Sequence, residues 1–166
     1  MDAIFNRVSI RAYEDKPVES EKIEKILRAA MSAPSAVNQQ PWEFYIVKDK
    51  STLEKLSKVH QYAGMVAKAP VAIVVCYRKE KNVVLPEYLQ IDCALATENI
   101  LLEITAQGLG GLMLGIAPDE GRMKLAGDAI NIPDELKVFT IIPFGYPLKN
   151  HAQQDRFDPS RIHTIE

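Results

Sequence analysis

The sequence predicts a domain in which helices pack around a small sheet, an α/β or α+β sandwich. Segments with apolar residues at helical spacing are mixed with only about four short apolar runs typical of strands. The 166 residues suffice to bury a hydrophobic core, and we expect one domain over residues 1–166. The 47% hydrophobic and 25% charged content is that of a globular chain.

The elements follow from local patterns in chain order. A helix is predicted at 20–32, ended by Pro34, then a strand at 43–49, a short amphipathic helix at 50–58 and an apolar strand after Pro70. Beyond the longest helix, discussed next, we expect a turn and short strand at 108–116, a helix at 119–128 and a core strand at 136–147. The polar stretch 153–166 is expected to wrap over a surface.

Residues 87–107 form the longest helical pattern, and it has two apolar stripes. One stripe contains Ile91, Leu95 and Leu102, the other Cys93, Ile100 and Ile104, and between them lie Asp92, Asn99 and Glu103. A surface helix needs only one apolar stripe to dock. Two stripes predict a central helix held from both sides, by its own domain and by a partner subunit.

Charge and composition argue against several kinds of function. The formal net charge of −2 gives no general attraction for nucleic acid or an anionic membrane. The N-terminus has no secretory signal pattern, and the apolar run at 69–77 is too short for a membrane span. Cys76 and Cys93 are expected to be buried free thiols in a reducing compartment, so we expect a cytoplasmic protein. The three histidines lack ligand spacing, so no metal site is predicted.

The glycines of the 108–116 run do not form a known nucleotide motif. Met113 stands where a dinucleotide fingerprint needs glycine, and Ile116 and Ala117 replace the Lys-Ser/Thr of a P-loop. Two interpretations remain equally good: tight backbone packing, or close approach of the backbone to a flat ligand.

Arg7, Ser9 and Arg11 alternate, so in an extended segment their side chains point the same way. Two guanidinium groups beside a hydroxyl suit a phosphate. Taken alone, the pattern is better explained by an exposed, partly charged strand. The balance changes when it is combined with other segments.

The loop "PSAVNQQPW" at 34–42 carries hydroxyl and amide groups that suit a polar ring edge or a ribityl chain. The glycine-rich run suits close backbone contact, and Arg156 adds a second possible charge. A flat ligand with polar edges and one phosphate fits all of these segments. FMN is such a ligand.

The chain resembles the FMN-dependent nitroreductase family, specifically its short members, over nearly its whole length. The resemblance rests on the order and separation of five segments: "RVSIRAY" at 7–13, "APSAVNQQPWEF" at 33–44, "GLGGLMLGI" at 108–116, "FGYP" at 144–147 and "DRFDPSRIH" at 155–163. It departs from the family at Val8 and Gln154, where many members have basic residues.

The resemblance implies which residues bind the cofactor. They are Arg7, Ser9, Arg11, Pro34, Ser35, Ala36, Asn38, Gln40, Met113, Leu114, Gly115 and Arg156. In the family the 34–40 loop reaches FMN from the other subunit, Arg11 lies near the pyrimidine edge, and an amide of 113–115 lies near N5. No residue is implied to be catalytic, because the flavin carries the chemistry.

The implied fold is a three-layer sandwich around a mostly antiparallel sheet, in an intertwined homodimer with FMN at the interface. The implied reaction is ping-pong hydride transfer from NADH or NADPH through FMN N5 to a nitroaromatic, quinone or similar acceptor. A specialised flavin reaction such as dehalogenation, and a flavin-binding or sensory protein without turnover, remain alternatives. Loops within 60–66 and 83–90 are expected to line the acceptor pocket, and packing is the favoured role for Tyr62 and Tyr88.

Overall fold

The computed structural model describes residues 2–79, 83–149, 152 and 155–166. Its strands form one antiparallel sheet in the order β1-β2-β5-β3, with β4 also paired to β5. The strands are β1 Trp42–Val47, β2 Val71–Arg78, β3 Gly110–Gly111, β4 Leu114–Gly115 and β5 Leu136–Gly145. The α-helices are α1 Asp2–Asn6, α2 Ser20–Met31, α3 Lys50–Leu56, α4 Leu89–Ala106 and α5 Glu120–Ile130.

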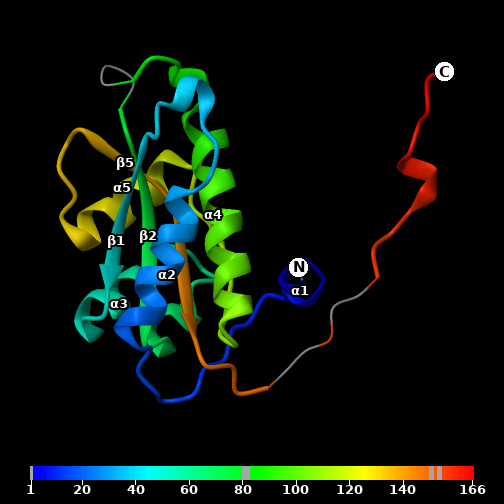
Figure 1. The fold of residues 1–166 in the computed structure, drawn as a ribbon. Coiled ribbons are helices and arrows are strands. Elements are labelled where there is room, and N and C mark those ends of the chain that lie inside the picture. The colour runs from blue at the N-terminus through cyan, green and yellow to red at the C-terminus, as the bar shows by residue number, and fades with distance from the viewer. Residues whose placement is uncertain (1, 80–82, 150–151, 153–154) are drawn as a thin grey trace.

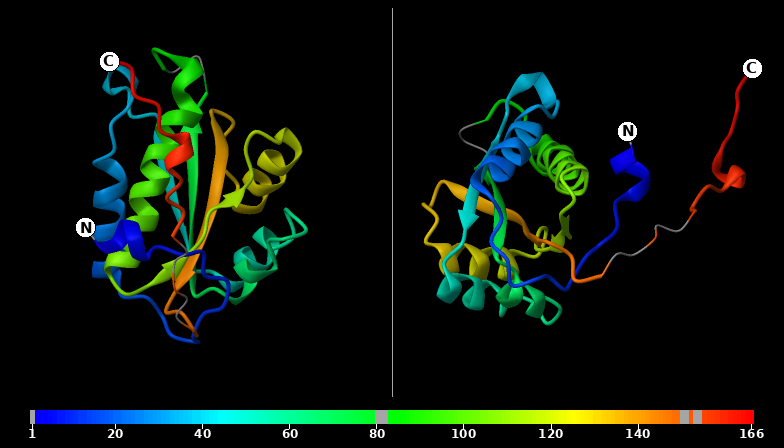
Figure 2. Two further views of the ribbon diagram at one scale, coloured as in Figure 1. Left: turned by 90° about the vertical axis from the view of Figure 1, so that its right-hand side faces the viewer. Right: turned by 60° about the horizontal axis from the view of Figure 1, so that its bottom comes forward.

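Helices cover both faces of this sheet, so the molecule has three layers (Figures 1 and 2). Helices α2 and α4 pack together on one face, and α3 and α5 lie on the other. Short 3-10 turns connect these elements: η1 Ala36–Asn38, η2 Gly64–Lys68, η4 Pro86–Tyr88 and η5 Pro159–Arg161. The predicted three-layer sandwich with an antiparallel sheet is confirmed.

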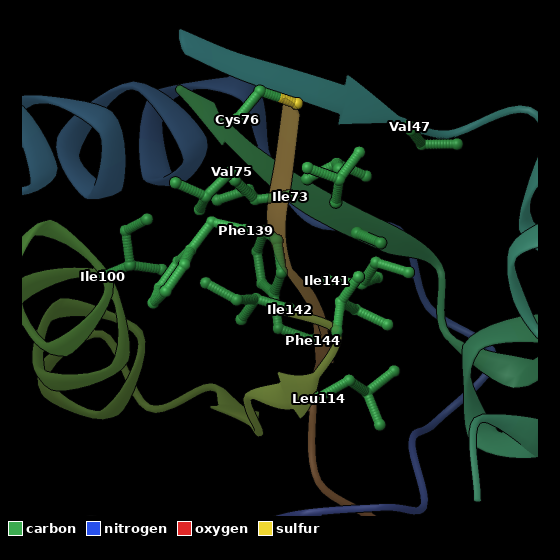
Figure 3. Close-up of a cluster of buried hydrophobic side chains, with 14 of the residues drawn as sticks. Val47, Ile73, Val75, Cys76, Ile100, Leu114, Phe139, Ile141, Ile142 and Phe144 are labelled. Atoms are coloured by element: carbon green, nitrogen blue, oxygen red, sulfur yellow. The ribbon is translucent and has the colours of Figure 1, made fainter. Parts of the chain in front are cut away.

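The core lies along β2 and β5, which are paired over most of their length. Both strands are mostly apolar and nearly every residue in them is buried, as expected where helices cover both faces. The side chain of Phe139 points toward Ile100 of α4 (Figure 3). The buried hydroxyl of Thr140 donates to the carbonyl of Leu114 over 2.6 Å and so fastens the short β4 to β5.

Helix α4 has one face in the core and one face without cover from its own chain. The predicted stripe of Cys93, Ile100 and Ile104 is fully buried. On the other stripe, Ile91 is 54% and Leu95 42% exposed. The two-sided character predicted for this helix is therefore present, and its outer face remains available.

The C-terminal segment 155–166 lies apart from the sheet and from helices α2 to α5 (Figures 1 and 2). It therefore does not cover the sheet of its own chain, and the expectation that it wraps over a surface stays a prediction that concerns a partner subunit. Phe157 is 73% exposed, and Ile162 and Ile165 are exposed as well. Gln154, one of the departures from the family pattern, lies outside the described residues.

None of the helices that the structure describes has the length and hydropathy needed to cross a bilayer. Within the same residues, no group of three or more His, Cys, Asp or Glu side chains is placed to hold a metal ion.

Candidate functional site

An open pocket of about 560 Å³ brings together three segments that are distant in sequence. Arg11 comes from the N-terminal segment, and residues 112–115 come from the β3–β4 connection. The third segment is the turn after α3, which contributes His60, Tyr62, Gly64 and Met65. Four predicted cofactor residues, Arg11, Met113, Leu114 and Gly115, thus line one cavity.

Arg11 reaches this pocket because the segment before it is fastened to β3. The amide of Ile10 donates to the carbonyl of Gly111 over 3.0 Å, and Ser9 forms a β-bridge with Gly111. The buried hydroxyl of Tyr13 donates to the carbonyls of Ile10 and Pro143 over 2.8 and 3.0 Å. Burial raises the pKa of this hydroxyl, an effect that the nearby Arg11 guanidinium opposes.

The alternation expected for this segment is observed at its centre. Ile10 is buried, whereas Ser9 and Arg11 are exposed on either side of it. Neither the Ser9 hydroxyl nor the Arg11 guanidinium makes a hydrogen bond or ion pair with any part of the chain that the structure describes. Arg7 is only loosely engaged, 3.8 Å from the carboxylate of Glu98 on α4.

The glycine-rich run is packed tightly at one end and open at the other. A Cβ on Gly110 would come within 2.5 Å of Ile10, so this glycine is required for packing. A Cβ on Gly115 would meet nothing within 4 Å, because this residue faces the open pocket. The run therefore combines tight packing at β3 with an open backbone at β4.

The β3–β4 connection also offers a free backbone donor. The carbonyls of Leu114 and Gly115 accept from Thr140 and Arg122, over 2.6 and 3.1 Å. The amide N–H of Met113 donates to no oxygen among residues 2–79, 83–149, 152 and 155–166. An unpaired amide and an unpaired guanidinium in one pocket form a donor set that suits a ligand with polar or anionic edges.

The loop at 34–40 is held by the buried carboxylate of Asp92, near the start of α4. Asp92 accepts from the amide of Ala36 over 2.9 Å and from the side chain of Gln39 over 2.7 Å. The Gln39 amide group also exchanges hydrogen bonds with the backbone of Leu85. Gln39 therefore has a structural role. The sequence showed Asp92 only as a polar residue between the two apolar stripes of the helix, with no sign that it supports this loop.

The same loop has an unusual backbone conformation and internal hydrogen bonds between its polar groups. Val37, Asn38 and Gln40 have φ values of 45°, 55° and 43°, in a region that non-glycine residues rarely adopt. Ser35 Oγ accepts from the Gln40 amide over 3.0 Å, and Asn38 Oδ1 accepts from the Gln40 side chain over 2.9 Å. The loop is thus shaped before any ligand arrives.

Several predicted site residues lie away from the Arg11 pocket of the same chain. The 34–40 loop, with Pro34, Ser35, Ala36, Asn38 and Gln40, is attached to Asp92 near the N-terminal end of α4, and none of its residues lines the pocket. Arg156 lies on the extended C-terminal segment. Residues 83–90 do not line this pocket in the described chain, and Leu85 instead supports the loop.

Loops within 60–66 are predicted to line the acceptor pocket, and four residues of this region line the Arg11 pocket. Tyr62 is 68% exposed, so packing within its own chain is not its role, contrary to expectation. Tyr88 is also exposed. His60 lines the pocket although its sequence surroundings give no motif.

Fold and site together define a three-layer α+β protein whose open pocket combines a free arginine with exposed backbone at a short strand. The family model described as "Nitroreductase family" matches residues 4–61 and 57–146. The chain belongs to the nitroreductase family.

Relatives agree with this membership along the chain. A protein of Methanothermobacter thermautotrophicus named "Putative NADH dehydrogenase/NAD(P)H nitroreductase" is 44% identical over 98% of this chain and 85% of its own. A crystal structure of a "Putative NADH Oxidase" from Clostridium acetobutylicum is 46% identical, covers 99% of both chains and has a TM-score of 0.94. An "FMN-dependent Nitroreductase" from Clostridium difficile R20291 is 30% identical, covers 100% of this chain and 99% of its own, and has a TM-score of 0.90.

Proposed function

We propose that the protein is an FMN-dependent oxidoreductase that uses NADH or NADPH to reduce nitroaromatic, quinone or similar acceptors. The family membership supports this activity, as do relatives whose names include an NAD(P)H nitroreductase and an FMN-dependent nitroreductase. The single observation that carries the proposal for this chain is that Arg11, whose guanidinium has no partner in the described residues, lines one open pocket together with residues 112–115.

The residues of this pocket fit FMN. A flavin needs a flat, open surface and donors at its polar edges, which the exposed backbone at Gly115 and the Met113 amide offer. When bound, FMN supplies the two-electron hydride chemistry. The chain's part is electrostatic: Arg11 is a fixed positive charge that stabilises negative charge developing at the edge of the ring. Ser9 and Arg7, on the same segment, are proposed to bind the phosphate and ribityl chain.

We further propose that the working unit is a cytoplasmic homodimer with FMN at the interface. The 34–40 loop is held by Asp92 near the start of α4, and none of its residues lines the Arg11 pocket of the same chain. A second copy related by a two-fold axis would bring its loop, with Pro34, Ser35, Ala36, Asn38 and Gln40, to this pocket. The exposed stripe on α4 supplies an apolar surface for such contact, and the extended segment with Arg156 is free to reach across.

The test is a visible absorption spectrum after FMN is added and the excess is removed by desalting. We expect the flavin spectrum to be retained and to bleach when NADH or NADPH is added without oxygen. Arg11→Gln should weaken FMN retention, whereas Lys25→Gln, an exposed charge change on α2, should not. Retained flavin that neither nicotinamide reduces would contradict the enzyme and favour a flavin-binding or sensory protein.

A further inference from the structure

The turn at 60–63 holds two ring side chains at the wall of the Arg11 pocket. The amide of Ala63 donates to the carbonyl of His60 over 2.9 Å, and Ala63 is fully buried. On the other side of the turn, Leu56 at the end of α3 is also fully buried. Because buried residues hold the turn on both sides, the backbone that carries His60 and Tyr62 has a fixed position at the pocket wall.

The backbone determines the tautomer of His60. The amide N–H of Tyr62 donates to Nδ1 of His60 over 2.9 Å, so Nδ1 is the nitrogen without a proton in the neutral ring. The ring proton then resides on Nε2. Within the described parts of the chain nothing accepts a hydrogen bond from Nε2. His60 therefore offers one donor of fixed identity to a ligand in the pocket.

Tyr62 provides a flat apolar surface beside this donor. Its ring lies 5.3 Å from that of His60, with an angle of 51° between the two planes. The exposed ring contributes little to the core, but its face is large enough to pack against another planar ring. Donor and ring together form a two-part recognition surface.

We propose that His60 and Tyr62 are specificity-determining residues that recognise a planar ring bearing a conjugated oxygen. Tyr62 packs against the ring, and Nε2–H of His60 donates to the oxygen. This inference rests on the proposed function, in which two ligands have that chemistry: the nicotinamide with its carboxamide, and a nitro or quinone acceptor. His60 keeps its proton throughout, and the proton that completes reduction of an acceptor comes from water.

His60 also favours reduction of such acceptors over acceptors that lack the oxygen. An acceptor oxygen gains negative charge as it is reduced, so the hydrogen bond from Nε2 strengthens on the way to the transition state. Acceptors with neither an aromatic ring nor such an oxygen gain nothing from either residue.

Three redox-inert probes test the pair on the oxidised FMN-loaded protein: acetophenone, ethylbenzene, which lacks the oxygen, and cyclohexyl methyl ketone, which lacks the aromatic ring. Binding is followed by the change in flavin absorbance. His60→Leu should weaken acetophenone binding about fivefold to tenfold and leave ethylbenzene unchanged. His60→Gln, which keeps an N–H donor, should restore part of the loss. Tyr62→Leu should weaken both aromatic probes and leave the ketone unchanged.

Gln61→Ala is the matched control, because Gln61 is an exposed residue in the same turn that does not line the pocket. Nitrogen NMR of the histidine ring gives a readout that is independent of turnover, and we expect a protonated Nε2 and an unprotonated Nδ1. Unchanged acetophenone binding in His60→Leu, or a protonated Nδ1 at neutral pH, overturns the assignment of His60. Unchanged binding of both aromatic probes in Tyr62→Leu overturns that of Tyr62.

The two half-reactions distinguish the ligands. In anaerobic stopped flow, a slower bleaching by NADH or NADPH in His60→Leu assigns the pair to the nicotinamide, and a slower reoxidation by nitrobenzene assigns it to the acceptor. Reoxidation by ferricyanide, which has no aromatic ring, should be unchanged. Failure of the wild-type protein to bleach contradicts the proposed function, whereas normal bleaching with unaltered probe binding contradicts only this inference.

Discussion

At the scale of single residues, Asp92 links the interior of α4 to the loop at 34–40. Its buried carboxylate accepts two hydrogen bonds from that loop, one of them from the backbone of Ala36. The loop contains three non-glycine residues with positive φ, each of which costs free energy. Charge-assisted hydrogen bonds to Asp92 offset part of this cost, so the shape of the loop depends on a residue that need not contact the ligand.

Asp92→Asn is expected to loosen this loop. The new amide group keeps one oxygen for the Ala36 amide but turns a donor toward the Gln39 side chain, which is itself a donor there. We expect FMN to bind about tenfold more weakly and the free energy of unfolding to fall by about 2 kcal/mol. FMN titration and urea unfolding measure the two effects. Glu103→Gln on the same helix removes a charge without touching the loop, and it should change neither.

The two thiols predict how stability depends on alkaline pH. Burial raises the pKa of the Cys76 thiol to about 12, and burial raises that of Cys93 as well. In the unfolded chain both titrate near ~8.5. The folded protein therefore keeps protons that the unfolded chain releases. Each buried thiol makes its full contribution to the free energy of unfolding below the pKa of the unfolded chain. Above that pKa, the contribution declines by ~1.4 kcal/mol per pH unit per thiol until the pH reaches the pKa of the folded protein.

This prediction is checked by urea unfolding between about pH 8 and about pH 10. The double variant Cys76→Ala/Cys93→Ala should be less stable at pH 8 because it leaves cavities, yet its stability should decline less steeply. If the free energy of unfolding fell equally steeply with pH in both proteins, the thiols would not be the cause of the loss of stability at alkaline pH.

At the scale of elements, the sequence predicts those whose pattern is local. The apolar runs of β2 and β5 and the two stripes of α4 are visible in the sequence, and the structure confirms them. The glycine-rich run could not be interpreted alone, because packing and ligand approach demand the same residue. At Gly110 the structure decides in favour of packing, because Ile10 lies directly against this glycine.

Gly110→Ala tests how closely the N-terminal segment is fitted to β3. Its Cβ would lie 2.5 Å from Cγ1 of Ile10, which must move and take Ser9 and Arg11 with it. We expect a loss of about 1–3 kcal/mol in the free energy of unfolding, together with weaker FMN binding. Gly64→Ala is the control, because its Cβ would meet nothing within 4 Å. Equal stability of the two variants would contradict the close fit.

At the scale of the whole molecule, the predicted site residues of one chain fall in separate places: Arg11 and residues 113–115 line one pocket, whereas the 34–40 loop is held by Asp92 of α4. The resemblance to the family implied both groups of residues and also implied that the 34–40 loop serves the site of another subunit, and these assignments remain predictions. Residues 60–66 were expected near the acceptor, but the sequence does not indicate which of their side chains line a pocket, because His60 and Tyr62 are placed beside Arg11 only by the fold. Pocket residues such as His60 and Tyr62 form no periodic pattern or motif in the sequence. Their place at the pocket depends on tertiary contacts, and the proposed role of the 34–40 loop also requires a second subunit.

The stripe on α4 provides the last test, because it separates a dimeric site from a monomeric one. Ile91 and Leu95 are 54% and 42% exposed, and Ile91→Glu/Leu95→Glu places two charges in the proposed interface. Such charges lose hydration on association unless they are paired, so we expect a monomer by light scattering. The monomer should also lose FMN, because its own 34–40 loop cannot reach its Arg11 pocket. Leu125→Glu on α5, where Leu125 is 55% exposed, should stay dimeric and retain the flavin. A monomeric stripe variant that still binds FMN normally would contradict a site shared between subunits while leaving the Arg11 pocket intact as the flavin site.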